Sequence, residues 1–252
     1  MPILLAHAGR AGDTQSCVMT LFSERDFRAG LELLGAIGEA EATSFAAVGV
    51  ERLSALVGSE FTTLSVCNLV SGKREVFGMP KGALSANDRA AFNRHFEEHP
   101  LVRFHGYEGG RVTQRISDCL PIARFRESPL FNDYYRRIRI DHAMALPIYV
   151  RDGLLVSFVL NRTRRDFTDR ERALLDLVRP DLERLYRRTR LLTSLSTREA
   201  EVLRWLANGK SDAQIGTILH ISVRTVQKHL QHLYAKLGVE NRTAAVMRAR
   251  RA

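Results

Sequence analysis

Apolar residues at helical spacing mark residues 222–237 of this 252-residue chain as an amphipathic helix. The apolar positions recur at steps of three and four and fall on one face: Val223, Val226, Leu230, Leu233 and Leu237. The opposite face carries Arg224, Gln227, Lys228, Gln231 and Ala235, with no carboxylate. A solvated helix usually mixes charges of both signs, whereas a helix that enters a DNA groove keeps donors and cations. The pattern therefore predicts a DNA-recognition helix.

The residues around this helix carry the signals of further short helices. Ser196 with Glu199 and Ser211 with Gln214 form two capping boxes, and Ser222 and Asn241 can cap two further helices. Gly209 and Gly238 stand where helices should end. His220 and Ile221 leave room only for a tight turn before the recognition helix. Four helices with such a turn before the third predict an all-α helix-turn-helix domain.

This stretch resembles the DNA-binding domain of LuxR/FixJ-type transcription regulators. The matching positions are Leu195-Ser-Thr-Arg-Glu199, Val202-Leu203, Gly209, Ile215, Leu219, Ile221-Ser222, Thr225-Val226, His229, Lys236-Leu237-Gly238-Val239, Arg242 and Ala245. The resemblance implies that side chains following Thr225-Val226 face the major groove. Together with the polar face described above, the resemblance indicates which residues contact DNA. The predicted base-reading residues are Arg224, Gln227, Lys228 and Gln231, and the predicted phosphate contacts are Thr225, His229, Lys236 and Arg242. Gly216 stands where the family commonly has Ala, and we expect it to soften its helix.

The preceding residues alternate between helical and extended patterns. Strands are expected at residues 61–67, 73–78, 112–117, 142–150 and 154–160, the last two joined by Asp152-Gly153, a strong hairpin signal. Helices are expected in two runs over 22–57, at 85–99 and 128–138, and from Thr168 onward with Pro180 inside. Hairpins and helices in this order predict an α+β fold with an antiparallel sheet and flanking helices.

This α+β region resembles a GAF-like sensor domain, with lower specificity than the first match. The carrying residues are His99-Pro100, Ile116-Ser117-Asp118, Tyr134-Tyr135 to His142, Asn161-Arg162, and Asp166-Phe167-Thr168 through Arg179-Pro180. The predicted organisation is a mobile extension (1–20), a GAF-like sensor or ligand-binding domain (21–188), a linker (189–194) and the helix-turn-helix domain (195–252). The linker region has no Pro or Gly that would uncouple the domains, which favours coupled domains. A solvated helix that leaves the domains independent explains the same residues, so both alternatives stay open.

An aromatic-rich stretch of the front domain suggests a ligand pocket. Its candidates are Phe104, Tyr107, Phe125, Phe131, Tyr134, Tyr135, His142 and Met144. Ordinary core packing explains the same pattern, so both interpretations stay open. Lactone receptors of the LuxR type depend on tryptophans and an aspartate around the ligand, but the only tryptophan here, Trp205, lies in the C-terminal domain. A lactone ligand is therefore not expected, and no early acidic pair supports control by phosphorylation.

Charge supports binding of a polyanion by the C-terminal domain. The chain has a net charge of +10, and residues 189–252 hold eleven Lys and Arg against four Asp and Glu, which is +7 and leaves +3 for the rest. The basic excess thus lies where DNA binding is predicted. Three widely spaced cysteines indicate reduced thiols in a cytoplasmic protein. No apolar stretch approaches the ~20 residues that span a bilayer, so no membrane partner is expected.

One motif favours a different class of protein. His95-Phe-Glu-Glu-His99 matches the HxxEH pattern of a class of zinc peptidases, with His105 as a third candidate ligand. The alternative prediction is thus a metal-dependent hydrolase with a DNA-targeting tail. The main prediction is a non-enzymatic, sequence-specific transcription regulator without metal or cofactor. Its predicted partners are double-stranded DNA at an inverted repeat, a second copy of the chain, a small-molecule effector and RNA polymerase.

Overall fold

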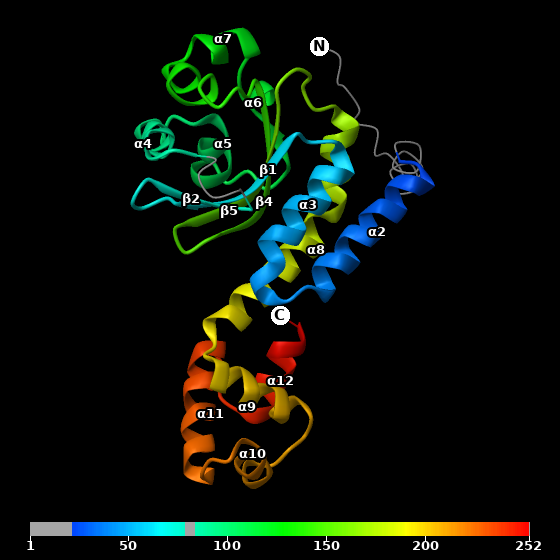
Figure 1. Cartoon of the computed structure of the whole chain (residues 1–252), viewed down its shortest axis with the longest axis vertical. Coiled ribbons are helices and arrows are strands. Elements are labelled where there is room, and N and C mark those ends of the chain that lie inside the picture. Colours follow the sequence, from blue (N-terminus) through cyan, green and yellow to red (C-terminus); the bar gives the residue numbers. More distant parts are fainter. Residues whose placement is uncertain (1–21, 79–83, 252) are drawn as a thin grey trace, which may run out of the picture.

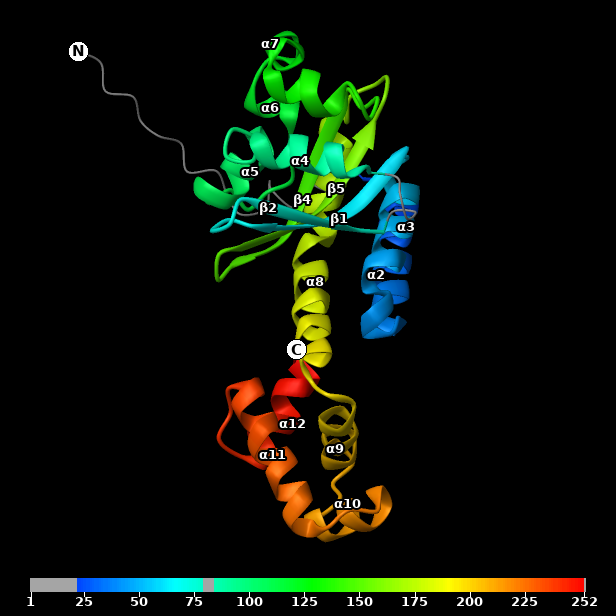
Figure 2. The same cartoon turned by 60° about the vertical axis from the view of Figure 1, so that its left-hand side comes forward.

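The chain consists of an α+β part and a helical part joined by one long helix (Figures 1 and 2). The structure is a computed structural model that describes residues 22–78 and 84–251. The expected mobile extension, residues 1–20, lies outside the described residues. The joining helix, α8 (Asp169–Ser194), leaves the sheet and runs toward the C-terminal helices.

The N-terminal part is built on a five-stranded antiparallel sheet of order β2-β1-β5-β4-β3. The strands are β1 (Phe61–Asn68), β2 (Lys73–Phe77), β3 (Gln114–Arg115), β4 (His142–Arg151) and β5 (Leu154–Arg162). The predicted hairpins form, and Asp152 and Gly153 turn the chain between β4 and β5 with positive φ angles of 55° and 69°. Two consecutive left-handed residues are what a tight hairpin turn requires.

One face of the sheet packs against three long helices. These are α2 (Glu24–Glu39), α3 (Phe45–Val57), reached through the short η1 (Ala42–Ser44), and α8. The apolar side chains between them include Leu53, Met144, Phe158 and Leu175, all fully buried. A Cβ on Gly49 would lie 2.4 Å from the Phe158 ring, so α3 approaches the sheet at a distance that only glycine permits.

The opposite face is covered by short helices (Figure 1). They are α4 (Ala86–Arg94), α5 (Pro100–Val102), η2 (Arg103–Tyr107), α6 (Ile116–Cys119), α7 (Ile122–Glu127) and η3 (Phe131–Tyr135). Both η2 and η3 are single π-helical turns, a form often found at functional sites. Aromatic side chains dominate this second core, with Phe92, Phe96, Phe125 and Tyr135 all buried.

Two sequence predictions for this part were wrong in extent. The helix expected over 85–99 ends at Arg94, because Pro100 starts a new turn and holds His99 in an extended conformation (φ −63°, ψ 120°). The strand expected over 112–117 keeps only Gln114 and Arg115, because α6 begins at Ile116. The residues expected to form the linker, 189–194, are helical and form the end of α8.

The C-terminal part follows the predicted helices closely. It comprises α9 (Thr197–Ala207), α10 (Asp212–Leu219), α11 (Val223–Leu237) and α12 (Arg242–Arg251). The capping boxes of Ser196 and Ser211 and the cap of Ser222 are all formed, and Gly238 ends α11 in the left-handed conformation. Within the described part of the chain, no helix is long and apolar enough to cross a membrane.

Gly216 has a steric role that the sequence did not reveal. A Cβ at this position would lie 2.8 Å from the Ile221 carbonyl oxygen, and the Ile221 N–H donates to the Gly216 carbonyl oxygen at 2.9 Å. The glycine therefore lets the turn between α10 and α11 close onto α10, instead of only softening that helix.

Candidate nucleic-acid interface and sensor cavity

Helix α11 presents the predicted polar face to solvent. Arg224, Gln227, Lys228 and Gln231 are exposed, whereas Val226, Leu230, Leu233 and Leu237 are buried against α9 and α10. The exception in the apolar stripe is Val223, which is 43% exposed at the first position of the helix. The start of α11 and all of α10 lie at the end of the molecule farthest from the sheet (Figure 2). The four polar side chains can therefore reach an external duplex.

The residues predicted to contact phosphate are placed less uniformly. Thr225 and His229 are half-buried on α11. Lys236 donates to Glu199 Oε2 at 2.6 Å, and Arg242 pairs with Asp212 at 2.9 Å and also contacts the Lys210 carbonyl oxygen. Two of the four side chains are thus already engaged within the domain.

Glu199 is the carboxylate that organises this domain. Its side chain is 4% exposed, accepts from the Ser196 N–H at 2.7 Å, and holds Lys236 of α11. Burial alone would raise the pKa of Glu199, but the hydrogen bonds from Lys236 and Ser196 outweigh it and lower the pKa. One side chain therefore caps α9 and ties it to the recognition helix.

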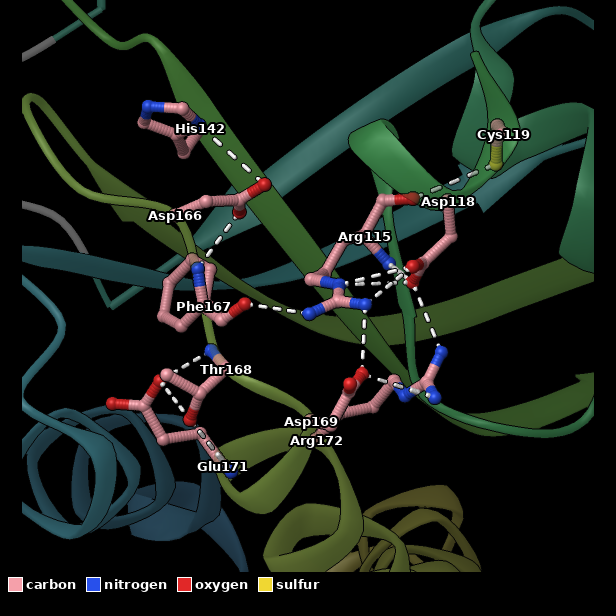
Figure 3. Close-up of polar contacts among 10 residues, drawn as sticks. All are labelled: Arg115, Asp118, Cys119, His142, Asp166, Phe167, Thr168, Asp169, Glu171 and Arg172. Carbon is pink, nitrogen blue, oxygen red and sulfur yellow. Dashed lines mark hydrogen bonds and ion pairs between the residues drawn. The ribbon is translucent and has the colours of Figure 1, made fainter. Parts of the chain in front are cut away.

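The residues predicted to line a pocket do not share one location. Tyr134 and Tyr135 face small cavities beneath the sheet, whereas Phe125 and Phe131 pack within the aromatic core around them. Met144 points into the core on the other face of the sheet. Of the remaining candidates, Phe104 is half-buried, Tyr107 is 49% exposed, and His142 lies 3.7 Å from Asp166 ahead of α8 (Figure 3). None of the six lines either cavity.

Two small cavities lie between the sheet and the short helices. The first, of about 30 Å³, is lined by Ser65, Cys67, Arg74, Phe92, His99, Leu101, Val102, His105, Tyr135, Ala145, Leu155, Ser157 and Val159. The second, of about 20 Å³, shares Arg74, Tyr135 and Val159 with it. Each has room for one or two water molecules as it stands. Arg74 and Tyr135 thus separate two parts of one hollow.

The floor of the first cavity is unusually polar for a sheet interior. Ser65 and Ser157 are direct cross-strand partners, and both are 4% exposed. Two buried polar atoms here, His105 Nε2 and Ser157 Oγ, have no hydrogen-bond partner among the described residues. Buried polar groups are nearly always satisfied in folded proteins, so such a pair marks a candidate binding site.

Five polar residues of this cavity were missed by the sequence reasoning: Ser65, Arg74, His99, His105 and Ser157. The available signal was the alternation Thr63, Ser65, Cys67 along β1, which places small polar residues on one sheet face. Aromatic content alone does not reveal this alternation.

The two buried histidines are held neutral. Burial, with the nearby Arg74 charge, lowers the pKa of His99 to about 3, and burial lowers the pKa of His105 to about 4. His99 Nδ1 accepts from the Leu101 N–H at 3.2 Å, so its Nε2 carries the proton and donates to the Tyr135 hydroxyl at 2.8 Å. His105 Nδ1 donates to the Gly110 carbonyl oxygen at 3.0 Å, which leaves its Nε2 as a bare acceptor.

The arrangement of the HxxEH residues does not match the metal site considered above. His95 ends α4 and lies 2.9 Å from Asp133, whereas His99 caps α5 and contacts Tyr135, so the two do not share a helix. Among the described residues, no group of three or more His, Cys, Asp or Glu side chains could hold a metal ion.

A polar network fixes the start of α8 to the short helices (Figure 3). Arg115 binds Asp118 at 2.6 Å, Asp169 at 2.9 Å and the Phe167 carbonyl oxygen at 2.7 Å. Thr113 donates from its N–H and its hydroxyl to Asp176 of α8, at 2.7 and 2.8 Å. The segment after the cavity residue His105 is therefore bonded to the helix that leads to the C-terminal domain.

Comparison with known proteins identifies the C-terminal part. Residues 193–249 match the family described as "Bacterial regulatory proteins, luxR family". The chain is 36% identical over 113 residues to the transcriptional activator protein BjaR1 of Bradyrhizobium diazoefficiens, which covers 43% of this chain and 47% of that protein. It is 47% identical over 55 residues to the transcriptional activator protein SolR of Ralstonia solanacearum, which covers 22% of this chain and 23% of that protein.

The chain matches less than half the length of these curated relatives. Among solved structures, that of SdiA in complex with octanoyl-rac-glycerol aligns with a TM-score of 0.48 and 19% identity, covering 91% of this chain and 96% of that chain. The C-terminal part of the chain is a DNA-binding domain of the luxR family.

Proposed function

We propose that the protein is a sequence-specific transcription regulator whose GAF-like N-terminal domain senses a small molecule. The observation that carries the proposal is the exposed, acid-free face of α11 within a luxR-family domain. Glutamine can bond adenine N6 and N7, and Lys or Arg can bond guanine O6 and N7. Arg224, Gln227, Lys228 and Gln231 therefore read bases, while Thr225 and His229 meet phosphates at the edges of the helix.

The two engaged cations, Lys236 and Arg242, have a different part in this proposal. Both are about 40% exposed at the side chain and keep free N–H donors beside their internal partners. They contribute to the positive field that attracts DNA, with weaker direct phosphate contacts than fully free side chains would make.

The test of base reading is Gln231→Ala measured on a site selected from random DNA by the full chain. We expect a loss of about 1–3 kcal/mol on the selected site and relaxed preference at one base pair. Non-specific DNA serves as the internal comparison, and Glu240→Gln, in the exposed turn after α11, serves as the control variant. An equal loss on every sequence would contradict base reading by Gln231.

The sensor proposal rests on the cavity beneath the sheet and its unsatisfied polar atoms. Effector binding there is proposed to reach DNA through the Thr113–Asp176 bonds and α8. The protein is proposed to act as a homodimer on an inverted repeat, with RNA polymerase as the further partner of such a regulator. The exposed Leu177 of α8 and Met247 of α12 are candidate dimer contacts.

A further inference from the structure

The polar groups around the cavity are mostly donors. The Tyr135 hydroxyl accepts from His99, and its own hydrogen meets no acceptor among the described residues. The Arg74 guanidinium lies 3.7 Å above the Phe92 ring and donates to the Tyr134 hydroxyl at 2.6 Å, which uses one of its five N–H groups. Ser157 adds a hydroxyl without a partner.

His105 gives the cavity an acceptor that cannot also donate, and no acid lines the cavity. His105 Nε2 is fully buried and lacks a proton, so it is satisfied only by a donor. No Asp or Glu lines either cavity, and the side-chain hydrogen bond of Arg74 within the described residues goes to the Tyr134 hydroxyl and not to a carboxylate. A half-buried cation without an anion, beside several free donors, is complementary to a negatively charged ligand.

We propose that the effector is a small hydroxy-carboxylic acid, bound through its carboxylate to Arg74, Tyr135 and Ser157 and through its hydroxyl to His105 Nε2. This proposal rests on the sensor function proposed above and specifies the chemistry of its ligand. A neutral ester or lactone of the same size would leave Arg74 without an anion. A plain acid without a hydroxyl would leave the buried acceptor His105 Nε2 without a donor.

The size and position of the cavities set how the acid enters. Arg74 stands on the edge strand β2 and closes both cavities, so its displacement from Phe92 and Tyr134 opens them to each other. The enlarged hollow is walled by apolar side chains that include Leu155 and Val159. It suits an acid of a few carbons, because a longer chain would collide with the buried core around it.

The first experiment measures binding to the full chain by isothermal titration calorimetry. The probes are glycolate, lactate and 3-hydroxybutyrate, each beside its methyl ester, with butyrate and N-butanoyl-homoserine lactone for comparison. We expect at least one hydroxy acid to bind at least tenfold more tightly than its ester, than butyrate and than the lactone. Binding of the esters or the lactone as tight as that of the acids overturns the proposal, as does the absence of binding by all three acids.

The second experiment tests the residues. Arg74→Gln should weaken binding of the acid more than tenfold and leave binding of the ester unchanged. Lys73→Gln is the matched control, because Lys73 is exposed on the same strand and lines neither cavity, and this variant should bind the acid normally. Ser157→Ala should leave the free protein as stable as before or more so, because the hydroxyl has no partner, yet weaken the acid. Unchanged acid affinity in both Arg74→Gln and Ser157→Ala overturns the proposed site.

The outcome for the sensor function is read separately, from DNA affinity with and without small molecules. A neutral compound that controls DNA binding would support the sensor and overturn the acid. A hydroxy acid that binds with the expected preference but leaves DNA affinity unchanged would support the ligand chemistry and overturn its role as an effector.

Discussion

At the scale of single residues, the clearest result is that Lys236 is held by Glu199. We expect Glu199→Gln to lower the free energy of unfolding of the C-terminal domain by about 1–3 kcal/mol, because the buried bond to Lys236 loses its charge assistance. Urea unfolding followed by circular dichroism measures the change. Glu201→Gln is the matched control, since Glu201 forms a more exposed pair with Arg198 on the same helix. Equal effects of the two substitutions would contradict the role of Glu199.

The buried histidines predict how stability depends on pH. In the unfolded chain they titrate near pH 6.5, but in the folded chain their pKa values lie at about 3 for His99 and about 4 for His105. Between these values the unfolded state binds more protons, so the folded state loses stability as the pH falls below 6.5. The slope reaches about 1.4 kcal/mol per pH unit for each histidine. Above pH 7 neither residue contributes a slope.

Urea unfolding at pH 7.5, 6.0 and 5.0 checks this prediction. Carboxylates with a lowered pKa, such as Asp118, change the stability only below their unfolded pKa near 4. Between pH 7.5 and 5.0 the change in stability therefore reports on the histidines. His105→Gln should reduce the slope by the share of one histidine. His105 lies near Arg111 and Asp176, and His99 near Arg74, so these charges should be kept unchanged in the comparison. A flat profile would show that neither histidine is buried in its neutral form.

At the scale of elements, local signals predicted what local interactions decide. The caps of α9, α10 and α11 and the Asp152-Gly153 turn depend on residues a few positions apart, and all formed as expected. The cavity depends on which side chains meet from β1, β2, β5 and the short helices. Aromatic content could not separate Phe125, which is core, from Tyr135, which lines the hollow. Likewise, the π-helical turns have no spacing that distinguishes them from ordinary helix.

Helix α8 contacts both parts of the chain near its C-terminal end. Arg190 contacts the Tyr149 hydroxyl and lies 3.7 Å from Asp152 in the hairpin of β4 and β5, while the next residue, Leu191, packs on the core of the C-terminal domain. Adjacent residues of one helical turn are thus anchored to different domains. Under the function proposed above, motion of α8 where it packs on the sheet should therefore be transmitted to the C-terminal domain, provided that the effector binds two arrangements unequally.

Inserting Gly-Ser-Gly-Ser between Arg190 and Leu191 should abolish the response to effector and retain DNA recognition. The matched control is the same insertion between Val70 and Ser71, in the exposed turn before β2. A reporter gene with the selected site measures regulation, and DNA affinity is measured on purified protein. Regulation that survives the insertion in α8 would show that the domains act independently, the alternative that the sequence left open.

At the scale of the whole molecule, one DNA-binding domain presents a small surface. A single module of this kind buries limited area on DNA, and two linked half-sites increase affinity and fix spacing. The elongated arrangement leaves α10 and the start of α11 at the far end, and α12 beside the end of α8 (Figures 1 and 2). Leu177 and Met247, each 41% exposed, lie on helices that a twofold partner could cover.

We expect two protomers to protect an inverted repeat whose half-sites lie about one helical turn apart, since each recognition helix must enter the major groove on the same side of the duplex. Footprinting at saturating protein measures the protected length, and sedimentation measures the stoichiometry. Met247→Glu should weaken cooperative binding to the repeat while leaving affinity for an isolated half-site unchanged, because it places a charge on the candidate contact. Glu240→Gln, away from α8 and before α12, should alter neither. Protection of a single half-site by a monomer would exclude the dimer.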